Sequence, residues 1–182
     1  MSSPQAVSVT LRPLTKEDVD QFARTFVHRE DWGEFEWFGY STHDHLYEGL
    51  ARDGFLGKES AALAIEADGK WAGRVLWWRN YYGGDPSWCW RFAVIVDPAQ
   101  RGRGIGTRGQ RLMVDYLFSH TAGNRIEAHV DARNIAELKA MEKSGFTREG
   151  TVRGSMWSEG SWHDQILHSI LRQDWQQPGP AE

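Results

Sequence analysis

Apolar residues recur along this chain with two periods, one of two residues and one of three to four residues. A period of two is typical of a strand with one buried face, and the longer period is typical of an amphipathic helix. The strand-like runs are bounded by turn-forming residues. They predict strands over 7–11, 61–67, 71–78, 88–96, 125–130, 147–155 and 163–171.

Helix-like runs occupy much of the remaining chain. Thr15 can cap a helix that continues to Phe26, and residues 42–52 form a second candidate helix. Between these two helices, residues 29–40 are aromatic and acidic without a clear period. We therefore expect residues 29–40 to form a loop.

Two further helices are predicted in the second half of the chain. The first begins near Ile105 and has one apolar stripe, formed by Ile105, Leu112, Met113, Tyr116 and Leu117. Asn134 opens the second helix, and Gly145 ends it as the residue after the cap. The residues of this second helix that we expect to face the core are Ile135, Leu138 and Met141.

The order of these elements predicts the fold class. It reads strand, two helices, three strands, helix, strand, helix, two strands, and Asp68-Gly69-Lys70 is typical of a tight hairpin. This order predicts a mixed sheet flanked by helices, an α+β or α/β fold, as a single domain over residues 1–175. Residues 176–182 contain two prolines and a glycine and predict a disordered tail.

Composition and charge narrow the function classes. The chain has 182 residues, 40% hydrophobic and 25% charged, which is typical of a globular domain. A net charge of −4 does not favour nucleic acid as a partner. The apolar runs are far shorter than the roughly 20 residues that span a bilayer, so no membrane is expected. A single cysteine, Cys89, and the absence of a signal-like start favour the cytoplasm.

The sequence Gln-Arg-Gly-Arg-Gly-Ile-Gly at 100–106 lies directly between a predicted strand and a predicted helix. Glycines allow backbone amides to approach a phosphate, and the start of the helix adds a positive dipole. Between Pro98 and Val114 there are four arginines and no acid. This segment predicts a pyrophosphate-binding loop. A tight turn without a ligand remains the alternative.

Two motifs and the chain's C-terminal part resemble the GCN5-related N-acetyltransferases (GNAT). Arg101-x-x-Gly104-x-Gly106 is similar to the family's first signature, and Asn134 followed by Gly145-Phe146 is similar to the second. Further residues are similar to the RimJ/RimL-type branch, so that the resemblance covers roughly residues 88–175. These residues are Lys143, Ser144, Glu149, Gly150, Arg153, Asp164, Ser169, Ile170, Leu171, Asp174 and Trp175.

This resemblance implies a fold, a coenzyme and a binding site. The fold is a mixed, mostly antiparallel sheet of six to seven strands with about four flanking helices. The donor is acetyl-CoA, whose pantetheine arm pairs with the strand end and whose pyrophosphate is held by backbone amides. The implied residues are Val94, Ile95 and Val96 for the arm, and Arg101, Gly102, Arg103, Gly104, Ile105, Gly106 and Thr107 for the pyrophosphate.

Asn134 has two readings that are compatible with each other. The resemblance implies that it approaches the pantetheine. Alternatively, Asn134 with Glu137 three residues later forms a capping box at the start of a helix.

The residues that usually donate a proton in this family are replaced in this chain. Many family members carry a tyrosine where this chain has Met141, and the branch often has serine where this chain has Glu137. Weak candidates for a base are Glu127 and His129, which share a strand face, and Glu159 on the last hairpin. Each carboxylate could instead be simply solvated. Cys89 lies in an apolar strand, where cysteines are usually inert.

The loop at 29–40 is the candidate acceptor site. Its acids and aromatics suit a cationic amine, with Glu34, Glu36 and Trp37 as the expected contacts. Aromatic residues that only fill the core are the alternative. His43 and His45 are the only tight histidine pair, and no metal is predicted.

Together these observations predict transfer of an acetyl group from acetyl-CoA to a primary amine by direct attack. The acceptor could be a small cationic amine, such as an antibiotic or metabolite, or a protein N-terminal amine. The alternative is a non-catalytic acyl-CoA-binding module, favoured by Met141 and Glu137. The expected assembly is a monomer or homodimer.

Overall fold

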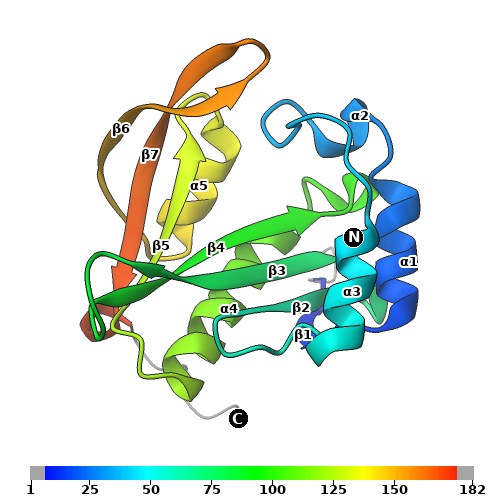
Figure 1. The fold of residues 1–182 in the computed structure, drawn as a ribbon, viewed down its shortest axis with the longest axis horizontal. Coiled ribbons are helices and arrows are strands. Elements are labelled where there is room, and N and C mark those ends of the chain that lie inside the picture. Colours follow the sequence, from blue (N-terminus) through cyan, green and yellow to red (C-terminus); the bar gives the residue numbers. More distant parts are fainter. Residues whose placement is uncertain (1–6, 176–182) are drawn as a thin grey trace, which may run out of the picture.

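The computed structural model describes residues 7–175, so the tail predicted at 176–182 and residues 1–6 of the predicted domain lie outside the described part. One seven-stranded sheet has the order β1-β2-β3-β4-β5-β7-β6 (Figure 1). Its strands are β1 (Val9–Pro13), β2 (Ser60–Ala67), β3 (Lys70–Tyr81), β4 (Trp88–Val96), β5 (Arg125–Asp131), β6 (Thr147–Ser158) and β7 (Ser161–Leu171). The helices are α1 (Lys16–Thr25), α2 (Arg29–Trp32), α3 (Asp44–Asp53), α4 (Ile105–His120) and α5 (Ile135–Lys143), with short 3-10 turns at Pro98–Gln100 and Arg172–Asp174.

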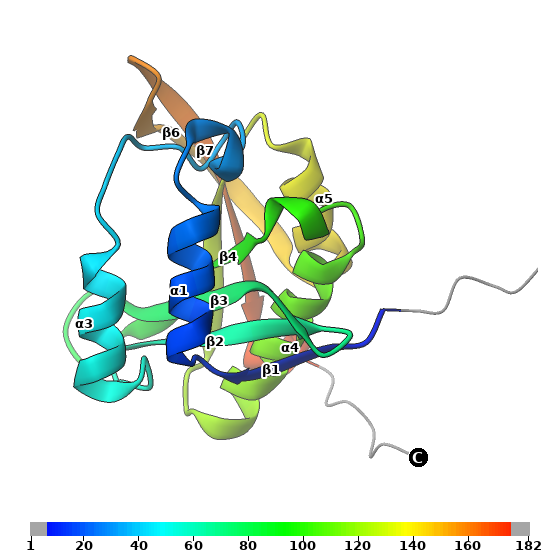
Figure 2. The same ribbon diagram turned by 90° about the vertical axis from the view of Figure 1, so that its right-hand side faces the viewer.

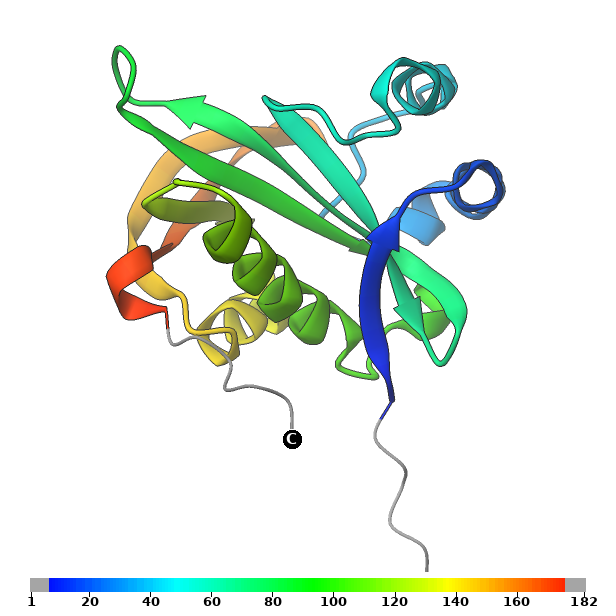
Figure 3. The same ribbon diagram turned by 90° about the horizontal axis from the view of Figure 1, so that it is seen from below.

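The sheet is mixed and mostly antiparallel, which confirms the fold class. Every neighbouring pair of strands is antiparallel except β4 and β5, which are parallel. Helices α1 and α3 cover one face of the sheet, and α4 and α5 cover the other (Figures 2 and 3). The larger core cluster lies under α4, with Ile65, Met113, Leu117 and Ile126 fully buried. A smaller cluster of Val19, Phe22, Phe26 and Leu46 lies on the opposite face.

The predicted loop at 29–40 contains a short helix, α2. Its start is fixed by Asp31, whose carboxylate accepts hydrogen bonds from the backbone N–H groups of Val27 (3.2 Å) and His28 (2.7 Å). Gly33 ends the helix with a φ of 80°. A helix of one turn has no room for apolar periodicity, so the sequence pattern could not predict it.

Helix α5 is confirmed, but one of its expected core residues faces out. Met141 is fully buried, whereas Ile135 is 56% exposed. Each step of three residues falls about 60° short of a full helical turn. Two such steps separate Ile135 from Met141 and carry Ile135 off the buried face. Across residues 7–175, none of the helices is long and apolar enough to cross a bilayer.

Strands β4 and β5 separate soon after they meet. They pair only at Trp90 with Ile126 and at Arg91 with Glu127. Beyond Arg91, β4 continues to pair with β3, and β5 continues to pair with β7. The facing edges of β4 and β5 are therefore left without strand partners, and this part of the sheet holds the candidate site.

Candidate active site

A cleft of about 830 Å³ opens where β4 and β5 diverge. Its walls come from distant parts of the chain: the segment after α2, the two strand edges, the glycine-rich loop and α5. Unpaired backbone N–H and C=O groups on a strand edge are available to hydrogen-bond an extended ligand. Residues from these segments that line the cleft include Glu34, Glu36, Val94, Ile95, Val96, Arg101, Gly102, Gly104, Ile105, Gly106, Thr107, His129, Asp131, Asn134 and Glu137.

The glycine-rich loop leaves open space where side chains would otherwise stand. Gly102 and Gly104 have φ values of 77° and 73°, which glycine adopts without strain. A Cβ added at either residue would meet no atom within 4 Å. The loop therefore leaves room for a ligand such as a diphosphate to approach its backbone.

Helix α4 begins directly beside this space. Gly104 is its N-cap and provides no side-chain cap, and the first turn contains no acidic residue. The first amides of the helix lack intrahelical partners, and the helix dipole favours an anion at this end. These features fit a CoA pyrophosphate at 102–107.

The arginines near the loop are engaged with the protein itself. Arg101 donates to the backbone oxygens of Asp31 (2.5 Å) and Val96 (3.3 Å), so it connects α2 to the end of β4. Arg103 pairs with Asp68 (3.1 Å), and it is not among the residues that line the cleft. These arginines contribute positive charge near the loop and brace its surroundings.

Asn134 caps α5. Its side-chain oxygen accepts a hydrogen bond from the N–H of Glu137 (3.1 Å). The reciprocal half of a capping box is replaced, because the Glu137 carboxylate accepts a hydrogen bond from Gln110 of α4. Both Asn134 and Glu137 line the cleft. Asn134 is therefore confirmed as the helix cap, but the complete capping box is not formed, and the predicted coenzyme contact of Asn134 stays a prediction.

The predicted acceptor loop contributes residues to the wall of the cleft. Glu34 and Glu36 line the cleft, but Trp37 does not. The Trp37 ring instead packs edge-on against Tyr40 at 4.9 Å between ring centroids. Trp37 therefore supports the loop from outside the cleft.

Glu36 is the titratable group most altered by the cleft. Burial among the cleft walls raises its pKa to about 7, with a further contribution from the negative charge of Glu137. Arg101 opposes this rise, and Asp131 adds to it. The Glu36 side chain is exposed to solvent at the cleft, so the rise in its pKa comes from the protein atoms that crowd around it there. Burial also raises the pKa of Glu137.

Glu127, predicted as a weak base candidate, is fully buried outside the cleft lining. It accepts hydrogen bonds from Arg91 (2.7 Å), Arg125 (3.0 Å) and the Tyr82 hydroxyl. Burial alone would raise its pKa, but these hydrogen bonds outweigh burial and lower the pKa. A carboxylate held in this way is suited to joining β3, β4 and β5, and poorly suited to accepting a proton.

Glu159, another base candidate, lies at the tip of the β6–β7 hairpin. It forms an ion pair with Arg29 of α2, and it does not line the cleft. This ion pair joins two segments that are far apart in the sequence (Figure 1). Glu159 and Arg29 therefore link the β6–β7 hairpin to α2.

His129 and Asp131 share the strand face of Glu127 but differ from it in position. Glu127 belongs to the last paired position of β4 and β5, whereas His129 and Asp131 follow the divergence and line the cleft. Burial, followed by the charge of Arg91, lowers the pKa of His129. The hydrogen bond from Arg133 lowers the pKa of Asp131 despite its burial. Strand alternation predicts a shared face, but it does not reveal where two strands part.

Cys89 is buried, and burial raises the pKa of its thiol to about 11. This agrees with the inert role expected from its strand context.

His43, of the predicted histidine pair, has its Nε2 within 3.0 Å of the Phe26 carbonyl oxygen.

Comparison with known proteins identifies the family of the chain. Residues 8–147 match the family described as "Acetyltransferase (GNAT) domain". The spermidine N(1)-acetyltransferase of Escherichia coli (strain K12) is 27% identical over 178 residues, 93% of this chain and 89% of the relative. A probable N-acetyltransferase of Bacillus subtilis (strain 168), YjcK, is 40% identical over 80 residues, and the match spans only 44% of each protein.

A solved structure has the same fold. It is the spermidine N-acetyltransferase of Vibrio cholerae in complex with CoA and spermine, with a TM-score of 0.73 and 22% identity. The alignment covers 91% of this chain and 96% of that one.

Proposed function

The chain belongs to the GNAT acetyltransferase family, and from this premise we propose that it transfers an acetyl group from acetyl-CoA to a primary amine of a small cationic acceptor. One observation carries the proposal: a single cleft is lined both by an uncapped helix start with open glycines and by four carboxylates. The carboxylates are those of Glu34, Glu36, Asp131 and Glu137.

Acetyl-CoA supplies the activated acetyl thioester. The edge of β4 at Val94, Ile95 and Val96 orients its pantetheine arm, and the amides from Gly102 to Thr107 hold its pyrophosphate. Asn134 approaches the arm from the start of α5 while its oxygen caps the helix.

The acceptor end of the cleft is suited to positive charge. Clustered carboxylates with partly desolvated surroundings attract a cation more strongly than exposed carboxylates do. Arg133 compensates Asp131, with N···O at 2.6 Å, so Glu34, Glu36 and Glu137 are the groups left to face the acceptor. A polyamine-like acceptor is further supported by the similarity to the spermidine N(1)-acetyltransferase of Escherichia coli.

Glu36 also accepts the proton that the ammonium group must lose before it can attack the thioester. A base works best when its pKa lies near the working pH, and Glu36 has a pKa of about 7. We place the reaction in the cytoplasm, in keeping with a single, buried cysteine.

The experiment is a kinetic comparison of acceptors at fixed acetyl-CoA, with CoA release measured and products identified by mass spectrometry. We expect mono-acetylated spermidine, with kcat/KM at least tenfold above that for butylamine, which has a single charge. Preference for a peptide N-terminus would overturn the acceptor class. Coenzyme binding without turnover of any amine would favour the non-catalytic acyl-CoA-binding alternative.

A further inference from the structure

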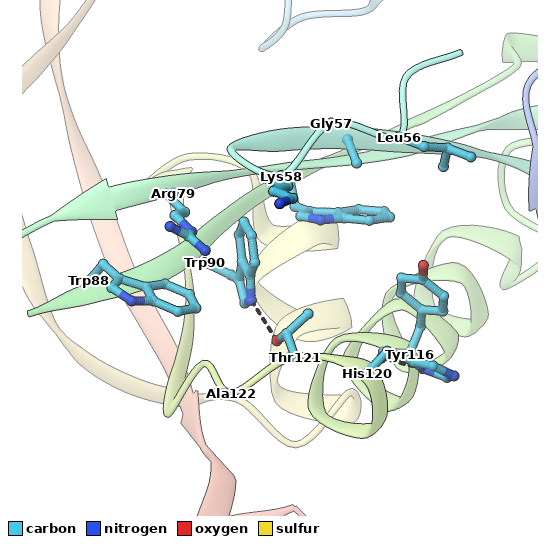
Figure 4. A pocket seen from close by; sticks show the side chains of 12 residues that line it. Leu56, Gly57, Lys58, Arg79, Trp88, Trp90, Tyr116, His120, Thr121 and Ala122 are labelled. Carbon is cyan, nitrogen blue, oxygen red and sulfur yellow. Dashed lines mark hydrogen bonds between the residues drawn. The ribbon is translucent and has the colours of Figure 1, made fainter. Parts of the chain in front are cut away.

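A second cavity of about 450 Å³ lies beside the C-terminal half of α4 (Figure 4). It shares no lining residue with the acetyl-CoA cleft, which begins at the other end of α4. From Ile105 to His120 the helix spans about 22 Å, at 1.5 Å per residue. We propose that this cavity binds a small planar aromatic carboxylate.

The walls of the cavity are flat rings. Trp77 of β3 and Trp90 of β4 are 4% and 3% exposed, so both are fixed in the core. The Trp77 and Tyr116 rings are 5.6 Å apart, and the Trp88 and Trp90 rings meet edge-on at 5.0 Å. Walls of this kind favour a flat apolar ligand, because aromatic rings pack in offset or edge-on contacts.

The rings that line this cavity are held in place by their own contacts. The Trp90 indole N–H donates to the Thr121 hydroxyl at 2.9 Å (Figure 4). Tyr116 stacks on His120 at 4.8 Å between centroids. A site whose walls are already ordered loses less conformational freedom when a ligand binds.

The charged groups of the cavity are cationic. Lys58 and Arg79 line it, and no acidic residue does. Figure 4 shows the Arg79 side chain beside the Trp90 ring, and its guanidinium lies 5.7 Å from the ring centroid. Arg79 is partly compensated by Glu59 at 3.0 Å, whereas none of the ion pairs among residues 7–175 includes Lys58.

Arg79 also has an unused donor. Its Nε–H is buried and has no hydrogen-bond partner among the described residues. A buried donor without a partner is unfavourable, and an anionic oxygen would satisfy it. Lys58 would pair with the same anion from the mouth of the cavity.

A cationic ligand is disfavoured at the same place. The Arg79 guanidinium already lies over the Trp88 ring, 4.4 Å from its centroid, and occupies the cation–π position. A second cation would meet Lys58 and Arg79 at short range. The cavity therefore suits the opposite charge from that of the acceptor end of the acetyl-CoA cleft.

Isothermal titration calorimetry with 2-naphthoate, in low salt, tests this proposal. The uncharged 2-naphthylmethanol is the matched control, because it has the same ring system without the carboxylate. We expect saturable binding of naphthoate at one site per chain, at least tenfold tighter than binding of the alcohol. Raising the salt concentration should weaken naphthoate binding, because Lys58 is solvent-exposed.

Three variants locate the bound naphthoate. Lys58→Gln should reduce its affinity several-fold, and Ala122→Phe, which fills the cavity from an exposed position, should abolish its binding. Lys70→Gln, an exposed lysine on the β2–β3 hairpin, should leave it unchanged. Thermal unfolding and CoA titration check that each variant is folded.

Several outcomes would overturn the site. These are the absence of saturable naphthoate binding, equal affinity for the alcohol, or binding that survives Ala122→Phe. Displacement of naphthoate by CoA would also overturn it, by moving the ligand to the acetyl-CoA cleft. None of these results would affect the proposed acetyl transfer, which is measured separately.

Discussion

Glu36 links the electrostatics of the cleft to the chemistry proposed for it. Its burial among cleft walls and the nearby Glu137 raise its pKa to about 7. Glu34, two residues earlier in the same loop, also lines the cleft, and both side chains are exposed to solvent. Comparing the same substitution at Glu36 and at Glu34 therefore distinguishes proton transfer by Glu36 from a general attraction of the cationic acceptor.

Replacing Glu36 with glutamine is expected to raise KM for the amine and to lower kcat by about 10²-fold or more. In the wild-type protein the ionised form of Glu36 accepts the proton, so the rate should rise with pH through about 7. Glu36→Gln should remove this inflection and leave KM for acetyl-CoA unchanged. Steady-state kinetics from pH 5.5 to 9 measure this, with Glu34→Gln as the control. Equal effects of both substitutions, or an inflection that survives Glu36→Gln, would contradict the assignment.

We expect substitution of Glu127 to lower the stability of the fold. Its carboxylate is fully buried, so removing it leaves the half-buried Arg91 without its carboxylate partner, while Arg125 keeps Glu149. Glu127→Ala should lower the free energy of unfolding by about 3–5 kcal/mol. Urea denaturation measures this change, and Glu59→Ala, which removes a 63% exposed partner of Arg79, should cost under about 1 kcal/mol. A large loss of kcat in a Glu127 variant of wild-type stability would instead make it catalytic.

At the scale of elements, the glycine-rich loop and α4 form one unit. Gly104 has left-handed geometry, caps α4 and borders open space. Gly54 ends α3 with a φ of 62°, also borders open space, and lies outside the cleft. Alanine at either residue meets a similar backbone strain of about 1 kcal/mol, so the pair isolates the effect of a methyl group in the phosphate loop.

Gly104→Ala should weaken acetyl-CoA binding at least tenfold, because its methyl group enters the space assigned to the pyrophosphate. Gly54→Ala should bind acetyl-CoA as the wild-type protein does, and both variants should lose similar thermal stability. Calorimetry and thermal unfolding of the two variants measure this. Equal coenzyme affinity in both would remove the loop from the site.

Single elements could be predicted from the sequence when one local cause sufficed. Thr15 caps α1, with its hydroxyl oxygen accepting from the N–H of Asp18 at 3.3 Å, as its position before an amphipathic run indicated. Asn134 likewise caps α5. Helix α2 was not predicted, because two hydrogen bonds to Asp31 fix its start and its sequence has no apolar period.

At the scale of the whole molecule, the cleft arises from a property that no single segment carries. Strands β4 and β5 pair at only two positions and then separate. Periodicity predicted both strands and the faces of their residues. The point of divergence depends on the partners β3 and β7, and hence on tertiary packing. For this reason Glu127 and His129, adjacent on one strand face, have different surroundings.

The central claim is that this divergence is an acyl-CoA site, and calorimetric titration of CoA into ligand-free protein tests it most directly. We expect one binding site per chain, with affinity lost in Gly104→Ala and retained in Gly54→Ala. If folded, ligand-free protein takes up neither CoA nor acetyl-CoA, the claim is contradicted.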